Sequence, residues 1–153
     1  RGLGDVYKRQ VEHDLNNGIP CAIARQQFDV VVSCFSIHHV EVTSRPRLYA
    51  DIWKVLRENG MFVNGDRFAG DSSVVHQWEF DNWIAWMVGQ IRGKLGKEKT
   101  FDEVKQTQVE SDKRMGDKPG TVWDMQRDLR EAGFRYVDCL WKSFNLAVIA
   151  ATK

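Results

Sequence analysis

The chain has 153 residues, of which 42% are hydrophobic and 28% charged, and its formal net charge at pH 7 is +1. This length suits one domain or the larger part of one, and the balanced charge argues against a polyanion partner recognised through net charge. The three cysteines (Cys21, Cys34 and Cys139) are an odd number without CxxC spacing, which argues against a disulfide or zinc framework. No apolar run approaches the roughly 20 residues that span a bilayer, so we expect a soluble, cytoplasmic protein.

The first ten residues, RGLGDVYKRQ, show neither helical nor strand periodicity. A processing segment and a basic arm are two interpretations, but the apolar core of a signal peptide and the Ser-rich amphipathic run of a transit peptide are missing. The whole decapeptide resembles one translated reading frame of a transposase adapter used in sequencing libraries. We therefore expect residues 1–10 to be an artefact without fold, and residues 11–153 to form the domain.

The next segments predict a βαβ unit. Residues 28–35 (FDVVVSCF) contain three successive valines, which indicates a strand buried on both faces of a helix-covered sheet. Residues 44–60 predict a helix that Gly60 ends in the left-handed conformation, and its apolar stripe is Leu48, Ile52, Val55 and Leu56. Residues 61–66 (MFVNGD) predict a second strand, so the three segments form a βαβ unit, whose connection must cross over right-handed.

The second half of the chain predicts helices followed by a hairpin. Apolar residues recur at helical spacing in residues 74–95, and the strongly polar residues 97–120 fit a second helix and a loop, so residues 73–117 are expected to form a helical insertion after the second strand. Thr121 and Asp124 have the spacing of a capping box at the start of a further helix. Residues 135–153 contain two strand-like runs separated around residues 142–143, which predicts a terminal antiparallel hairpin. The fold class expected is therefore α/β, with parallel strands that end in an antiparallel hairpin.

Four stretches in this order resemble the class I S-adenosylmethionine-dependent methyltransferases of the ubiquinone-biosynthesis and tRNA wobble-uridine carboxymethyl types. They are VEHDLNNGIP, QFDVVVSCFSIHHV, LYADIWKVLRENGMFVNGD and LREAGFRYVDCLWKSFNLAVIAATK. The resemblance implies the C-terminal part of a Rossmann-like methyltransferase fold, with residues 73–117 as a substrate lid. The turn RENG departs from the usual K-P-G-G, a mild change because Asn tolerates the left-handed conformation.

The same resemblance implies that part of the family's domain is missing. Its first strand, the glycine-rich loop that holds the cofactor and the acid that binds the ribose would all lie before Val11. We therefore expect an N-terminally truncated domain that is inactive on its own.

The resemblance also implies where S-adenosylmethionine is bound. Asp14 fits the acceptor for the adenine amino group, and Leu15 offers a backbone N–H beside it; the alternative is a loop Asp that forms an Asx turn. Cys34, Phe35 and Ser36 end the first predicted strand, and ligands of open α/β sheets bind beyond the carboxyl ends of strands. These three residues are expected to flank the methionine part of the cofactor, although they also suit a simple strand end.

Five further residues are candidates for substrate binding. His38 and His39 follow the first strand, and His39 is a candidate general base because the ordinary pKa of histidine suits neutral pH. Asp66 and Arg67 follow the second strand, where they either orient the substrate or form an exposed turn. Trp78 lies on the predicted lid, where an aromatic stripe is either core or a binding platform. We expect no metal, because adjacent histidines on one turn do not point together and no second cluster of ligands accompanies them.

The function predicted is methyl transfer from S-adenosylmethionine to a small molecule or a tRNA nucleoside. No membrane partner is expected, and binding of nucleic acid is not favoured because no basic run accompanies the tryptophans. Two alternatives are a nicotinamide-dependent oxidoreductase, which would need a GxGxxG turn before the first strand, and a non-catalytic binding subunit with the same fold.

Overall fold

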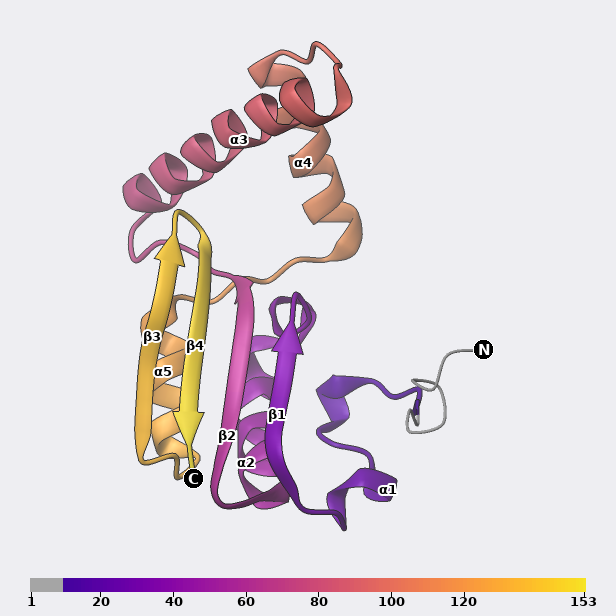
Figure 1. Cartoon of the computed structure of the whole chain (residues 1–153), viewed down its shortest axis with the longest axis vertical. Coiled ribbons are helices and arrows are strands. Elements are labelled where there is room, and N and C mark those ends of the chain that lie inside the picture. The colour runs from indigo at the N-terminus through magenta and orange to yellow at the C-terminus, as the bar shows by residue number, and fades with distance from the viewer. Residues whose placement is uncertain (1–9) are drawn as a thin grey trace.

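A four-stranded sheet forms the centre of the molecule, for which a computed structural model describes residues 10–153. The sheet order is β1-β2-β4-β3, where the strands are β1 (Phe28–Cys34), β2 (Leu56–Arg67), β3 (Tyr136–Ser143) and β4 (Leu146–Thr152). β1 is parallel to β2, whereas β4 is antiparallel to both β2 and β3 (Figure 1). The adapter prediction for residues 1–10 concerns a segment that, apart from Gln10, lies outside the described residues.

Helices α2 (Arg45–Val55) and α5 (Val122–Glu131) cover the same face of this sheet (Figure 1). Their apolar stripes meet the strand residues that point toward them, as the helical periodicity predicts. Members of this core that are at most 4% exposed include Leu48, Tyr49, Ile52, Leu56, Phe62, Leu129, Phe134, Ala147, Ile149 and Ala151. The predicted α/β class is confirmed.

The other face of the sheet is exposed along much of β1 and β3 in residues 10–153, whereas β2 and β4 are mostly half-buried on it. Val30 and Val32 of β1 are 53% and 68% exposed, so the prediction of a strand buried on both faces is wrong. The reason is that β1 is an edge strand among residues 10–153 and that α2 covers only one of its two faces. The sequence pattern measures how apolar a strand is and does not show which neighbours cover it.

The turn between α2 and β2 also differs from expectation. α2 ends at Val55, and Asn59, with a φ of 61°, takes the left-handed conformation predicted for Gly60. Gly60 is needed for another reason: a Cβ there would lie 2.8 Å from the carbonyl oxygen of Arg57. The prediction for Gly60 is therefore wrong, whereas the tolerance of Asn for this conformation is confirmed.

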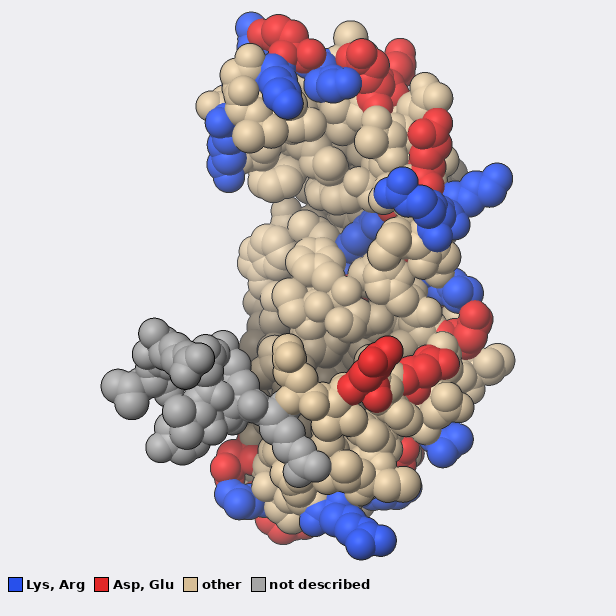
Figure 2. All heavy atoms as spheres, turned by 90° about the vertical axis from the view of Figure 1, so that its right-hand side faces the viewer, with Lys and Arg blue, Asp and Glu red and all other residues tan. Residues whose placement is uncertain are grey.

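Between β2 and α5 the chain forms α3 (Ser73–Leu95) and α4 (Phe101–Met115), which extend away from the sheet (Figure 1). They bury a small apolar cluster of their own around Phe80, Ile84 and Val104. None of the helices in residues 10–153 combines the length and apolarity that crossing a membrane requires. Figure 2 shows that charged side chains gather over the α3–α4 end and the opposite end, and that the middle of this face is mainly uncharged.

Two predicted turn features have different outcomes. The capping box of Thr121 and Asp124 is confirmed, with the side chain of each residue accepting from the backbone N–H of the other. The hairpin turn lies at residues 144–145, where Phe144 has a φ of 50°, and not around residues 142–143 as predicted. The β-like residues Lys142 and Ser143 still pair with β4, which moves the turn two residues along the chain. The remaining elements are short: η2 (Leu15–Asn17), α1 (Cys21–Ala24), η3 (Ile37–His39) and η4 (Val42–Ser44).

Candidate functional site

The carboxyl ends of β1 and β2 lie side by side and bring the two predicted substrate segments together. Because the strands are parallel, Cys34 pairs with Gly65, so the residues that follow both strands leave the same edge of the sheet. The Asp66 carboxylate accepts the backbone N–H groups of Ile37 and His38 at 3.0 and 3.3 Å. Its other oxygen lies 2.5 Å from His38 Nδ1. Asp66 therefore fixes both the turn η3 and the ring of His38.

Asp66 is ionised despite its burial. Its side chain is 2% exposed, and burial raises its pKa. The hydrogen bonds from His38 and from the backbone N–H of Arg67 outweigh that effect, so the pKa of Asp66 lies below its usual range. The alternative of an exposed turn is excluded for this residue.

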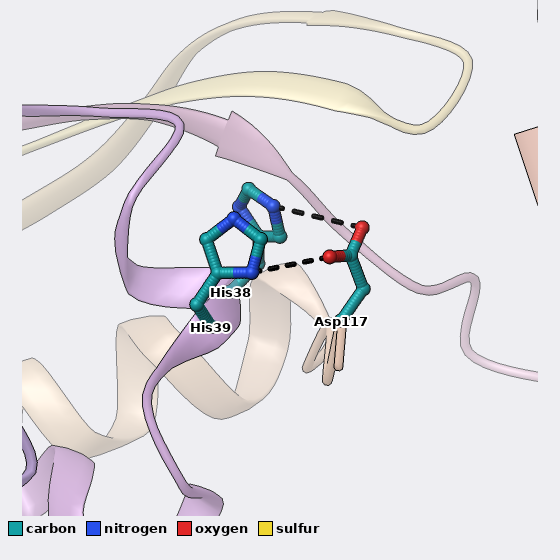
Figure 3. Close-up of side chains that lie close together, drawn as sticks. All are labelled: His38, His39 and Asp117. Atoms are coloured by element: carbon teal, nitrogen blue, oxygen red, sulfur yellow. Dashed lines mark ion pairs between the residues drawn. The ribbon is translucent and has the colours of Figure 1, made fainter. Parts of the chain in front are cut away.

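Asp117 completes a cluster with the two histidines, and sequence reasoning missed it. His39 Nδ1 lies 3.1 Å from Asp117 Oδ1, and His38 Nε2 lies 3.7 Å from Asp117 Oδ2 (Figure 3). The two imidazole rings are 3.9 Å apart between centroids, so the expectation that adjacent histidines point apart is wrong. The cause is the tight turn η3, which the backbone N–H of Lys118 ties to the loop of Asp117 by a 2.7 Å bond to the His38 carbonyl.

Arg67 is held by carboxylates and does not project freely toward a substrate. Its guanidinium donates two parallel bonds of 2.7 Å to Asp112 and a further bond of 2.7 Å to Asp117. It also lies over the ring of Trp83, 4.8 Å from the centroid. Burial lowers the pKa of Arg67, but these carboxylates outweigh it and keep the pKa above its usual value. Arg67 therefore connects the end of β2 to α3, to α4 and to the loop of Asp117.

Three of the five predicted cofactor residues line one apolar groove. Leu15, Cys34 and Ser36 border a groove of about 210 Å³ between η2, β1 and α2. Phe35 is half exposed and has a φ of 48°, a left-handed conformation that costs a non-glycine residue about 1–3 kcal/mol. Asp14 caps η2, where its Oδ1 accepts the backbone N–H and the side-chain amide of Asn16 at 2.9 Å. Asp14 thus forms the Asx turn of the alternative interpretation, and its cofactor role stays a prediction.

The tryptophans of α3 separate into two environments. Trp83 and Trp86 line a groove of about 260 Å³ together with Trp141 and Phe144 of the hairpin. Trp78, the predicted substrate residue, is 61% exposed and meets Phe144 edge-on, with the ring centroids 6.5 Å apart. The groove adjoins the histidine cluster through Arg67, which contacts both Trp83 and Asp117.

Comparison with known proteins gives one family match and a set of similar structures. Residues 6–64 match the family model described as a methyltransferase domain, which is less than half of the chain. No curated protein matches the chain.

Several solved methyltransferases have a similar fold. An O-methyltransferase family protein from Burkholderia thailandensis is 11% identical, with a TM-score of 0.54 over 86% of this chain and 32% of that protein. The SAH-bound form of CalO1, a methyltransferase in calicheamicin biosynthesis, is 15% identical, with a TM-score of 0.52 over 92% of this chain and 33% of that protein. The S-adenosylmethionine-dependent methyltransferase SibL is 13% identical, with a TM-score of 0.51 over 86% of this chain and 33% of that protein.

This chain spans between 30% and 40% of the length of the first solved structures that it matches. Its described residues therefore have the fold that is found in one part of these methyltransferases.

Proposed function

We propose that this chain is part of an S-adenosylmethionine-dependent methyltransferase that acts on a small molecule or a nucleoside. The observation that carries the proposal is the match of residues 6–64 to a methyltransferase domain. This range contains β1, α2 and most of β2. It therefore includes the groove beside β1 and the two histidines that follow this strand. The fold shared with solved methyltransferases supports the proposal.

The groove beside β1 fits one part of this cofactor. Its lining is apolar except for the Ser33 and Ser36 hydroxyls and the Cys34 thiol, which suits the faces of an adenine ring or the carbon chain of a methionine. Its volume of about 210 Å³ is below the roughly 300 Å³ at which ligand pockets usually begin, so these residues enclose only part of the cofactor. We therefore propose that the chain alone binds the cofactor weakly and does not complete methyl transfer.

Methyl transfer from this cofactor needs few acid–base groups. The cofactor, when bound, supplies an electrophilic methyl group for an in-line displacement, and the protein contributes positioning. In this chain the strained turn at Phe35 and the turn η3 held by Asp66 give the rim of the groove a fixed shape. His39 as a general base stays a prediction.

Alkylation of cysteines tests the cofactor site within the chain as it exists. Cys34 and Cys21 are both exposed, but Cys34 lines the groove and Cys21 lies on α1 outside it. Iodoacetamide labelling at pH 7, with rates followed for each cysteine by peptide mass spectrometry, should slow at Cys34 as S-adenosylmethionine is added. A half-maximal effect in the millimolar range would correspond to about 4 kcal/mol of binding.

Cys21 serves as the internal control, because its labelling rate should not change. Equal rates at Cys34 with and without near-saturating cofactor would remove this groove from the proposal. Equal slowing at both cysteines would indicate consumption of the reagent and would equally count against the site.

A further inference from the structure

Figure 3 shows three side chains from two segments that converge on a common point. His38 and His39 come from η3, and Asp117 comes from the loop between α4 and α5. One ligand atom from each lies within 4.8 Å of the others. Two atoms bound to one tetrahedral Zn²⁺ at about 2.1 Å stand about 3.4 Å apart. The imidazole–carboxylate distances of 3.1 and 3.7 Å lie on either side of that value.

We propose that His38, His39 and Asp117 bind a first-row divalent cation such as Zn²⁺. Two imidazole nitrogens and one carboxylate are ligands that suit Zn²⁺ and its neighbours in the first transition row. The proposal concerns a site separate from the cofactor groove and does not depend on methyl transfer.

The hydrogen bonding of His38 supports this site. His38 Nδ1 lies 2.5 Å from Asp66 Oδ1, so that Asp66 holds one ring nitrogen and the other, Nε2, faces Asp117. Metal-binding histidines commonly donate their second N–H to a carboxylate in this way, which fixes the tautomer and increases the basicity of the ligand nitrogen. A cation between Nε2 and the Asp117 carboxylate would be attracted by both groups.

The contacts of Asp117 point in the same direction. The Asp117 side chain is 7% exposed, and 3.7 Å is too long for a hydrogen bond to His38. Asp117 Oδ1 and His39 Nδ1 are both buried, and neither has a hydrogen-bond partner among residues 10–153, although they lie 3.1 Å apart. A buried carboxylate oxygen normally has a partner. A shared cation would satisfy this oxygen and both nitrogens together.

Local charge leaves room for a dication. Arg67 bonds to both Asp112 and Asp117, so that two carboxylates share its single positive charge. With Asp66 there are three carboxylates and one guanidinium, an excess of two negative charges in a site where isolated carboxylates are costly to bury.

Other nearby cations do not supply the missing charge directly. Lys118 is paired with Glu41. Arg45 donates to the carbonyl groups of Val40 and Lys118 and forms no ion pair with a carboxylate of the described chain. One divalent cation would therefore balance the two carboxylates in excess.

His39, one of the three proposed ligands, is partly exposed, so a cation can reach the site from solvent. The side chain of His39 is 35% exposed, whereas that of His38 is 6% exposed. An ion held by three protein atoms keeps a fourth position for water or another ligand. A cation on His39 Nδ1 would prevent this histidine from acting as a general base, so the proposal replaces that predicted role.

Metal titration of the EDTA-treated 153-residue chain tests the site. Zn²⁺ should bind with a stoichiometry of one in calorimetry, and Co²⁺ should give visible d–d bands that Zn²⁺ removes. His39→Gln is the most informative variant, because His39 is the most exposed ligand and its loss should disturb folding least. His13→Gln is the matched control, because His13 is exposed and outside the cluster.

His39→Gln and Asp117→Asn should each weaken Zn²⁺ binding at least about tenfold, and Asp66→Asn should weaken it about 10–100-fold through His38. Zn²⁺ should also raise the melting temperature of the parent chain and of His13→Gln more than that of His39→Gln. The proposal is wrong if the parent chain binds no Zn²⁺ at pH 7.5 and Co²⁺ gives no d–d bands. It is also wrong if His39→Gln and His13→Gln bind Zn²⁺ equally well.

Discussion

Replacement of Arg67 by methionine tests what holds the α3–α4 part of the molecule to the sheet. Methionine keeps much of the apolar stem but removes the guanidinium that contacts Asp112, Asp117 and Trp83. The side chains of Arg67, Asp117 and Asp112 are 11%, 7% and 24% exposed, so two carboxylates would lose a partner in a mostly buried site. Breaking a buried ion pair in this way costs about 3–5 kcal/mol. The partial exposure of Asp112 favours the lower end, so we expect a loss of about 3 kcal/mol.

The chain offers a matched control for this measurement. Arg57 also donates two bonds to one aspartate, Asp29, but their side chains are 55% and 77% exposed. Because exposed pairs contribute about 0–1 kcal/mol, Arg57→Met should be nearly neutral. Urea unfolding followed by far-UV circular dichroism measures both losses. Hydrogen exchange should increase most in α4 and in the loop of Asp117 in the Arg67 variant.

A double-mutant cycle makes the test stricter. Asp112→Asn in the Arg67→Met background should cost less than Asp112→Asn alone, since the pair is already broken. The reasoning would be refuted if Arg67→Met and Arg57→Met lost the same stability, or if the Arg67 and Asp112 effects were simply additive.

Three further outcomes are expected. Thr121→Ala should lower the free energy of unfolding by about 1 kcal/mol, because it removes the side chain that caps α5, whereas Thr107→Ala on the exposed side of α4 should not. The hydrogen bond from Thr121 lowers the pKa of Asp124, so the stability that Asp124 contributes is fully present above its unfolded pKa of about 3.9. It is lost as pH falls through the lower folded value, and acid unfolding of Asp124→Asn should lack that component; an unchanged acid transition would argue against it. Val32→Lys, on the exposed face of β1, should change the free energy of unfolding by less than about 0.5 kcal/mol. It should also reduce concentration-dependent association in sedimentation velocity, and unchanged association would show that this edge strand is not involved.

The sequence predicts those parts of the fold in which a short-range pattern has one structural outcome. The stripe of Leu48, Ile52 and Val55 can only be buried on one side of a helix, and the three residues are at most 4% exposed. The capping box of α5 is equally local, because its hydrogen bonds join Thr121 and Asp124, which are three residues apart. Predictions fail where the outcome depends on which distant segments of the chain pack beside an element. The valines of β1 have the composition of a buried strand but lie at an edge, which no local pattern shows.

Turn positions are intermediate cases. The sequence RENG contains two residues able to take a left-handed conformation, and either Asn59 or Gly60 satisfies the local chemistry. Tertiary packing decides between them, because the backbone of Gly60 passes too close to Arg57 and Asp29 for a side chain. Asn59 then adopts the positive φ.

The candidate site likewise contains residues whose positions follow from the strand order and residues whose positions depend on tertiary contacts. His38 comes after β1 and Asp66 lies at the carboxyl end of β2, and because parallel strands bring their carboxyl ends to one edge, the proximity of these two residues follows from the topology. Asp117 follows the left-handed Gly116 that ends α4, and nothing in its neighbours on the chain points to the sheet. Its position depends on a bond from Lys118 to the backbone of His38 and on the guanidinium of Arg67, which are contacts across tens of residues. Their spacing alone predicts that the two histidines point apart, because the turn that aligns their rings and the nearby Asp117 carboxylate are both tertiary features.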